Sequence, residues 1–347
     1  MSDERPLRGT GHAGVAVDRN PGAVQRIPVE GREPLSVRLR GLLWQLAWEA
    51  LRRLPEALAF SAGAAAAPAL RLLARRQRRQ LRANLSRVLP SARPADLDAL
   101  VAAGFRSYTR YFVEAFRAAD LTARDVSERT STSGMELLDA ALDRGRGAVI
   151  LLAHHGTWDV AAAWGEANAY HLAVVAEVVR PRALFEKFVR LRETVGLEVV
   201  PLRRGDSLVG RLSTVLAANH MVGLLSDRDL TGRGPVVDLF GEPARIPPGP
   251  VVLARRTGAA VFPVTMLQRP GRRWHLEVLP EIDVVSGTLE DGCAALARGI
   301  EAIVRTDPTQ WHALSPVWLA DVPAHRRGDL PQGVAARLEG ISRSGEA

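Results

Sequence analysis

The chain has 347 residues, of which 47% are hydrophobic, and a formal net charge of +8. This length fits one large α/β domain with extensions, and the positive charge favours anionic partners such as phosphates or membrane surfaces. Cys293 is the only cysteine, which excludes an internal disulfide and a cysteine-ligated zinc site and fits a cytosolic compartment.

The N-terminal third of the chain predicts a polar tail followed by helices. Residues 1–34 are polar and Gly-rich and lack the apolar core of a secretory signal, so we expect a disordered tail there. Residues 35–89 have helical apolar spacing and many flanking arginines. Their basic face is either a solvated surface or an amphipathic surface that lies on anionic lipid. Residues 95–118 also read as helix.

No stretch of this region predicts a transmembrane span. The best match, Ala57–Leu70, is 14 residues long, is mostly alanine and contains Gly63 and Pro68. A spanning helix needs roughly 20 apolar residues. We therefore expect an interfacial or core helix here.

From about Gly145 onward, apolar runs of strand length alternate with helical stretches. This alternation predicts an α/β fold with a mainly parallel central sheet covered by helices. We expect one domain over residues 35–325, with a helical part over 35–120, an α/β part over 145–320, and a frayed tail over 326–347. The expected strands are residues 147–153, 173–179, 197–202, 221–226, 260–267 and 275–280.

Two of these strands end on residues that carry chemistry. The first ends on His154 and His155, and the strand over 221–226 ends on Asp227. Ligands of open α/β sheets bind beyond the carboxyl ends of the strands. His154 and Asp227 are therefore expected to face one crevice, although 73 positions separate them in the chain.

Asp159 offers a second acidic partner for His154 because the spacing His154-x4-Asp159 crosses a short loop into a helix start. A carboxylate there can accept a hydrogen bond from the imidazole, fix its tautomer and make the ring a general base. His155 is the weaker base on spacing alone. The alternative is a helix-capping Asp159 beside two incidental histidines. A metal site is not predicted, since neither an HExxH motif nor a cluster with a third ligand is present.

A polar block over residues 226–250 follows the strand that ends at Asp227. It contains Arg228, Asp229 and Arg245 among several glycines and prolines. Long loops after buried strands are usually functional. Alternating charge suits phosphate recognition by arginine, with carboxylates holding the guanidinium groups. The alternative is a solvated loop.

Covalent mechanisms find little support in the sequence. No GxSxG elbow is present, which disfavours a serine acyl-enzyme, and neither a P-loop nor a GxGxxG motif occurs. Cys293 lies in an ordinary amphipathic helical stretch. The mechanism that remains is direct transfer of a group to its acceptor, assisted by a histidine base.

Four ordered blocks stand out in the chain: LLAHHGTWDVAAAW, AEVVRPRALFEKFVRLRETVGLEVVPL, LLSDRDLTGRGPVVDLFGEPARIPPGPVVLARRTGAAVFPV and WHALSPVWL. Together they resemble the lysophospholipid acyltransferase superfamily. More narrowly, they resemble the branch shared by lipid A late acyltransferases and actinobacterial phosphatidylinositol mannoside acyltransferases. The resemblance runs from about Leu39 to Asp321, and the pairing of HHGTWD with SDRDLTGRG favours the mannoside enzymes.

The resemblance implies transfer of a fatty chain from acyl-CoA to a sugar hydroxyl, here a mannose of a phosphatidylinositol mannoside, without a cofactor or metal. The family's catalytic histidine falls on His154 and its orienting acid on Asp159. A second acid falls on Asp227, where some members have Glu. The resemblance also implies peripheral association with the cytoplasmic face of the cell membrane. Supporting pocket residues fall on Glu177, Arg192 and His312.

Two other functions stay open at this point. One is a lipid A type acyltransferase that uses an acyl carrier protein as donor. The other is a non-catalytic protein that binds lipid or nucleic acid through its arginine surface. We expect no nucleic acid partner, because no recognised motif or aromatic-interleaved basic stripe is present.

Overall fold

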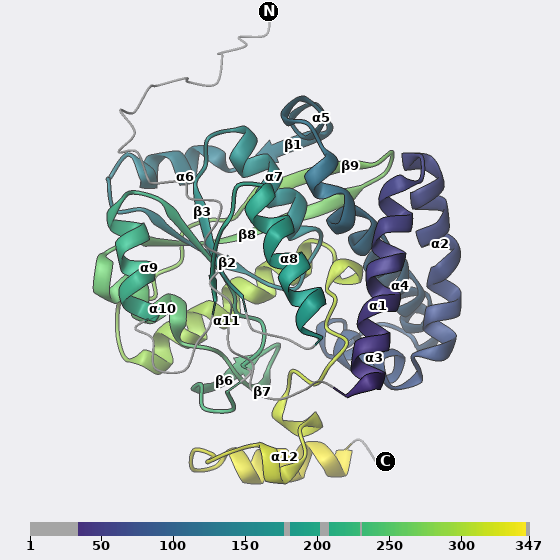
Figure 1. The fold of residues 1–347 in the computed structure, drawn as a ribbon. Helices are drawn as coiled ribbons and strands as arrows, with labels where there is room; N and C mark the ends of the chain where they lie inside the picture. The colour runs from purple at the N-terminus through teal and green to yellow at the C-terminus, as the bar shows by residue number, and fades with distance from the viewer. Residues whose placement is uncertain (1–33, 177–180, 202–207, 230, 345–347) are drawn as a thin grey trace, which may run out of the picture.

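The structure is a computed structural model that describes residues 34–176, 181–201, 208–229 and 231–344. The predicted disordered tail, apart from Pro34, and Glu177 lie outside the described residues. A seven-stranded sheet in the order β1-β9-β8-β2-β5-β3-β4 forms the centre (Figure 1), and all neighbours are parallel except β8 and β9. The mainly parallel α/β fold is therefore confirmed. The strands of this sheet are β1 (Thr130–Ser133), β2 (Ala148–Leu152), β3 (Leu172–Ala176), β4 (Glu198–Pro201), β5 (Met221–Leu225), β8 (Ala260–Arg269) and β9 (Arg273–Val278). A separate antiparallel hairpin consists of β6 (Val236–Leu239) and β7 (Glu242–Arg245).

Helices cover both faces of the sheet, which explains why its central strands are apolar throughout. Successive residues of β2 point to opposite faces: Val149 and Leu151 join one hydrophobic cluster, while Ala148 and Ile150 join another. The first face is covered by α9 (Leu208–Ala217), α10 (Gly249–Thr257) and α11 (Leu289–Thr306). The second is covered by α6 (Met135–Leu142) and α7 (Trp158–Ala167), with α8 (Arg182–Thr194) beside α7, and α5 (Ala123–Arg129) precedes β1.

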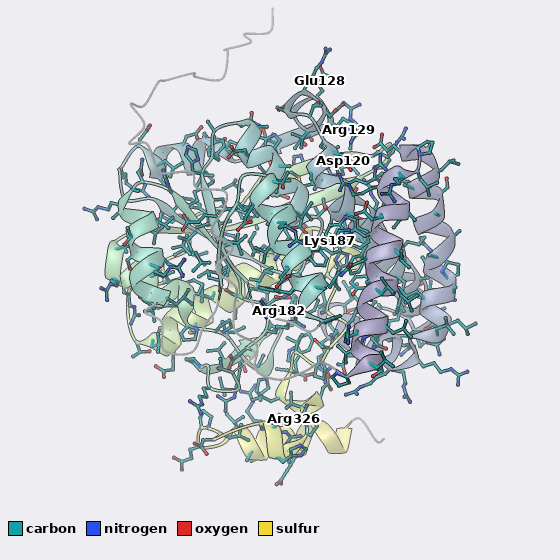
Figure 2. All side chains as sticks on the ribbon, viewed as in Figure 1. Asp120, Glu128, Arg129, Arg182, Lys187 and Arg326 are labelled. Carbon is teal, nitrogen blue, oxygen red and sulfur yellow. The ribbon has the colours of Figure 1, made fainter. Side chains whose placement is uncertain are left out.

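The predicted helical part forms four helices grouped at one side of the sheet (Figure 1): α1 (Leu35–Arg53), α2 (Glu56–Leu73), α3 (Arg75–Val88) and α4 (Pro94–Arg117). Ion pairs tie the first two helices to the α/β part. Lys187 of α8, labelled in Figure 2, pairs with Glu49 of α1. Arg129, at the end of α5, binds Glu56 of α2 at 2.7 Å. These contacts fix the helical part against the sheet.

Small residues bring α2 close to α4. Ala59, Gly63 and Ala67 recur every fourth residue and are the buried positions of α2. A Cβ at Gly63 would lie 2.7 Å from a methyl carbon of Val113 on α4, so only glycine permits this approach. Among the described residues, α2 is the one helix long and apolar enough to cross a membrane by length and composition. In the structure it packs along α4.

The prediction of a frayed C-terminal tail is wrong for residues 334–344. These residues form α12 (Val334–Ser344). Leu338 is buried, and Arg337 forms an ion pair with Asp238 at 2.9 Å. The segment is held because its apolar side chain docks on the domain while its arginine reaches β6.

Candidate active site

The site lies where β2 and β5 end side by side. The two strands are parallel and paired through Leu152 and Leu225, so the residues that follow them meet at the same edge of the sheet. His154 Nδ1 lies 2.7 Å from Asp227 Oδ1. Asp227 Oδ2 accepts hydrogen bonds from the His154 backbone N–H at 3.1 Å and from Trp311 Nε1 at 2.9 Å. The expected meeting of His154 and Asp227 is confirmed.

The surroundings of Asp227 determine which nitrogen of a neutral His154 ring carries the proton. Burial alone would raise the pKa of Asp227, but the His154 imidazole, the Trp311 indole and the His154 amide offset burial and hold this pKa well below its usual range. The carboxylate is therefore ionised and accepts the Nδ1 proton of His154. The lone pair of the neutral ring then lies on Nε2, as a general base requires.

The turn after β2 depends on Gly156. This residue has φ +63°, and a Cβ there would overlap the backbone carbonyl of Met266. Its N–H donates to Gln310 O at 2.9 Å, and the Thr157 N–H donates to Met266 O at 2.9 Å. The chain thus turns within a few residues from β2 into α7, leaving His154 with 22% of its side chain exposed at the rim.

Arg228 and an aromatic wall face the same histidine. Arg228 Nη2 lies 3.3 Å from His154 Nε2, and its Nη1 donates to Ser315 Oγ at 3.1 Å. The rings of Tyr111 and Trp158 are tilted by 30° with centroids 4.1 Å apart, and the His154 ring meets Trp158 edge-on at 5.7 Å. The arrangement combines a base, a cation and an apolar wall, which suits the attack of a hydroxyl on an ester-like carbonyl.

Comparison with known proteins decides the family. Residues 36–320 match the family described as bacterial lipid A biosynthesis acyltransferase. This chain belongs to that family. A protein from Mycolicibacterium smegmatis named phosphatidylinositol mannoside acyltransferase is 40% identical over 308 residues, covering 87% of this chain and 99% of the relative. A protein of the same name from Mycobacterium tuberculosis is 38% identical over 312 residues, covering 88% and 96%. The resemblance inferred from the four sequence blocks is confirmed.

Asp159 of the acyltransferase does not make the hydrogen bond to His154 that its spacing predicted. Its fully buried carboxylate accepts instead from Arg192 Nε at 3.0 Å and from Tyr111 Oη at 2.9 Å. Asp159 lies in the first turn of α7, and its partners come from α8 and α4. The acid therefore ties three helices together, and Arg192, predicted as a pocket residue, is its counter-ion.

We predict that Asp159→Asn acts mainly on stability. Removing one charge from a buried ion pair costs about 3–5 kcal/mol, because the remaining charge has no partner. The melting temperature should fall clearly, while kcat of the folded enzyme should change less than about tenfold, which is below the usual loss of a general base. Asp96→Asn is the matched control, since its pair with Arg93 is exposed and worth at most about 1 kcal/mol. A loss of kcat beyond about 10²-fold at unchanged melting temperature would contradict this assignment.

The predicted block over residues 226–250 is divided in its roles. Arg228 reaches the site, but Asp229 closes its own loop by accepting the N–H groups of Thr231, Arg233 and Gly234 at 2.7–2.9 Å. Arg245 donates to the carbonyl of Gly234 at 2.6 Å and through two nitrogens to the carbonyl of Arg327, at 3.0 and 2.8 Å. Backbone groups therefore occupy both side chains, which gives Asp229 and Arg245 structural roles in this loop, and their binding of substrate stays a prediction.

His312, predicted from the resemblance, is brought into the site. Its backbone N–H donates to the His154 carbonyl at 2.7 Å, and its ring lies 5.4 Å from Tyr108 and 5.6 Å from Tyr111. Burial above all, together with the neighbouring His155 and His154, lowers the pKa of His312 to about 3.

Sequence reasoning missed Tyr108, Tyr111 and Trp311. The signals that could have found them are the helical spacing of the two tyrosines and the position of Trp311 beside His312.

His155 has a structural role. Both ring nitrogens are used inside the protein, Nδ1 with Thr265 Oγ at 2.7 Å and Nε2 with the Asp307 carbonyl at 2.9 Å. Burial lowers the pKa of His155 to about 4.

Among the described residues, no group of three or more His, Cys, Asp or Glu side chains is arranged to hold a metal ion.

Proposed function

We propose that this acyltransferase transfers a fatty acyl chain from acyl-CoA to a mannose hydroxyl of a phosphatidylinositol mannoside. The observation that carries the proposal is the His154–Asp227 pair, whose Nε2 lone pair lies at the open edge of the sheet. The names and long coverage of the two mycobacterial relatives support the choice of acceptor.

In the proposed reaction, His154 Nε2 takes the proton of the acceptor hydroxyl while the oxygen attacks the thioester carbonyl carbon. The tetrahedral intermediate collapses to the new ester and expels the CoA thiolate, which receives the proton back from the imidazolium. Asp227 stabilises this imidazolium through Nδ1. Arg228 must rotate away from Nε2 when the hydroxyl enters, since both groups need the same lone pair.

The oxyanion of the intermediate requires hydrogen-bond donors. At the start of α7, the backbone amides of Gly156 and Thr157 are engaged with the carbonyls of Gln310 and Met266. The Trp158 amide is left as a donor, since the first N–H groups of a helix have no intrahelical acceptor and carry the positive end of the helix dipole. The Arg228 guanidinium, once it leaves Nε2, is a second donor.

A product assay tests the proposal. The purified enzyme is incubated with labelled palmitoyl-CoA and mannosylated phosphatidylinositol, and the lipids are resolved. We expect a mannose-acylated lipid and one free CoA per acyl group transferred. Parallel incubations replace the donor with acyl carrier protein thioester, or the acceptor with a lipid A precursor. Transfer only from the acyl carrier protein thioester would refute acyl-CoA as the donor, and transfer only to the lipid A precursor would refute the mannoside as the acceptor.

We also propose that the enzyme lies peripherally on the cytoplasmic face of the membrane, with α1 to α3 as the contact surface. Several leucines of α1 and α2 are exposed to solvent, and Leu73 is 81% exposed. Exposed apolar patches of this kind mark sites of interaction with a membrane or another protein. Arg75, Arg76 and Arg79 are exposed at the start of α3, directly after these leucines. Apolar side chains beside arginines are the pattern of a helix surface that binds anionic lipid. The exposed leucines are Leu35, Leu39, Leu42, Leu43, Leu46, Leu58, Leu72 and Leu73.

We predict that binding to liposomes requires anionic lipid and weakens as salt is added. Each arginine near an anionic surface contributes about 1 kcal/mol, screened over roughly 8 Å at physiological ionic strength. Arg75→Glu with Arg76→Glu should therefore lower the affinity at least about tenfold in a sedimentation assay. Arg256→Glu with Arg298→Glu, exposed on α10 and α11, makes the same charge change elsewhere and serves as control. Equal binding to neutral and anionic vesicles would contradict the proposal.

A further inference from the structure

One nitrogen of the His312 ring is left without a hydrogen bond in the part of the chain that the structure describes. Nε2 lies 2.9 Å from Ser107 Oγ, whereas Nδ1 is buried and has no hydrogen-bond partner among the described residues. The whole residue is only 8% exposed. Buried polar atoms without a partner are rare in native proteins, and each one needs an explanation such as a ligand. The ring has Tyr108 and Trp158 as neighbours, with centroids 5.4 and 6.2 Å away, and Trp158 also meets the His154 ring edge-on.

A chain of hydrogen bonds leads away from Nε2, and a backbone carbonyl fixes its direction. One terminal atom of the Gln268 amide lies 3.2 Å from Ser107 O and 3.1 Å from Glu114 Oε2. Since a carbonyl oxygen only accepts, that atom is the amide nitrogen. The other, the amide oxygen, lies 3.0 Å from Ser107 Oγ. At the far end, Glu114 Oε1 accepts from Trp274 Nε1 at 3.0 Å and from Arg110 Nε at 2.7 Å.

This direction determines the tautomer of His312. The Ser107 hydroxyl has one proton, and it is donated to the Gln268 amide oxygen. Ser107 Oγ must then accept from His312, so Nε2 carries the ring proton. With the proton on Nδ1 instead, one of the two contacts of Ser107 Oγ would set two lone pairs against each other. Burial keeps the ring neutral by lowering the pKa of His312, and Nδ1 is therefore a hydrogen-bond acceptor.

We propose that the chain Ser107–Gln268–Glu114 holds His312 in its Nε2–H tautomer, so that Nδ1 accepts a hydrogen bond from an O–H or N–H group of substrate bound beside His154. The proposal deepens the proposed function and rests on it for the identity of the substrates. Two groups have this chemistry: a second hydroxyl of the acceptor sugar, and an amide N–H in the arm of the thioester donor. Ser107, Gln268 and Glu114 are positioning residues, because they act through His312.

The tautomer is measured first, without substrate, by nitrogen-15 NMR of histidine-labelled protein, with His312→Asn identifying the His312 signals. We expect the Nε2–H form at pH 7. In Ser107→Ala the acceptor of this proton is lost, and the two tautomers should mix. An Nδ1–H form or an imidazolium in the unmodified enzyme at pH 7 would overturn the proposal, even if Ser107→Ala fails to fold. Failure of the proposed function leaves this readout unchanged and is detected separately, as absence of transfer by the unmodified enzyme.

Steady-state kinetics of Ser107→Ala then identify the bound group. We expect the KM of one substrate to rise about tenfold, the usual worth of one hydrogen bond to a neutral group, with little change in kcat. A raised KM for the mannoside indicates a sugar hydroxyl, and a raised KM for acyl-CoA indicates an amide. Thr265→Ala removes the matching hydroxyl from His155 and should lower the melting temperature without changing either KM. If Ser107→Ala is folded with both KM values unchanged, the inference fails.

Discussion

Replacement of His154 by alanine is expected to lower kcat by about 10²–10⁴-fold, the usual contribution of a positioned general base. The ring is partly exposed at the rim of the sheet, and its loss leaves no other base on the Asp227 carboxylate. Acyl transfer to the mannoside is the measurement, with the melting temperature recorded beside it. The melting temperature should change little, since the imidazole is not part of the core.

His155→Ala is the matched control for this experiment. Both nitrogens of His155 bind inside the protein, so its loss should lower the melting temperature and leave kcat of the folded enzyme largely intact. Similar losses of kcat in both variants, at equal fractions of folded protein, would refute the assignment of His154 as the base.

Asp227→Asn is expected to lower kcat by about 10²–10⁴-fold with little change in KM. Trp311 Nε1 and the His154 amide both donate to one oxygen of Asp227, so an asparagine will turn its carbonyl toward them. Its NH2 group then faces His154 Nδ1, which must accept instead of donate. The ring proton moves to Nε2, and the base is lost although no atom of the histidine has changed.

Asp159→Asn is the appropriate comparison, because it makes the same chemical change in a second buried carboxylate of the site. Asp227→Asn should lower kcat more than the melting temperature, and Asp159→Asn should do the reverse. NMR of His154 gives an independent reading, with Nδ1–H in the unmodified enzyme and Nε2–H in Asp227→Asn. An unchanged tautomer with full activity would leave Asp227 only a structural role.

The contrast between these two aspartates shows what sequence reasoning can reach. The strand that ends on His154 was predictable, because its apolar run and the residues that follow it are local features. Asp227 was predictable as a neighbour from the general rule that parallel strands present their ends at one edge. The role of Asp159 was not, since a spacing of five residues fixes distance along the chain but not which helix face holds the carboxylate. The buried partners Tyr111 and Arg192 determine that direction.

Other parts of the site depend on contacts between distant segments. In the sequence, Arg245 looks like a phosphate-binding residue because it lies in a polar loop of alternating charge. In the structure, its guanidinium donates to the carbonyl of Arg327, 82 positions away. His312 was identified only through the family resemblance, because no motif beside it in the chain indicates a binding site. Its partner Ser107 is separated from it by 205 positions. No local pattern predicts such a pair.

The packing of α2 on α4 bears on the membrane contact that we propose for this enzyme. Ala59, Gly63 and Ala67 hold the two helices together by close backbone approach, and contacts of this kind draw on dispersion rather than on the release of water from apolar surface. Such an interface keeps its strength when hydrocarbon replaces water around it. In the membrane contact proposed here, the outer, alanine-rich face of α2 would exchange water for lipid while its inner face stays docked on α4.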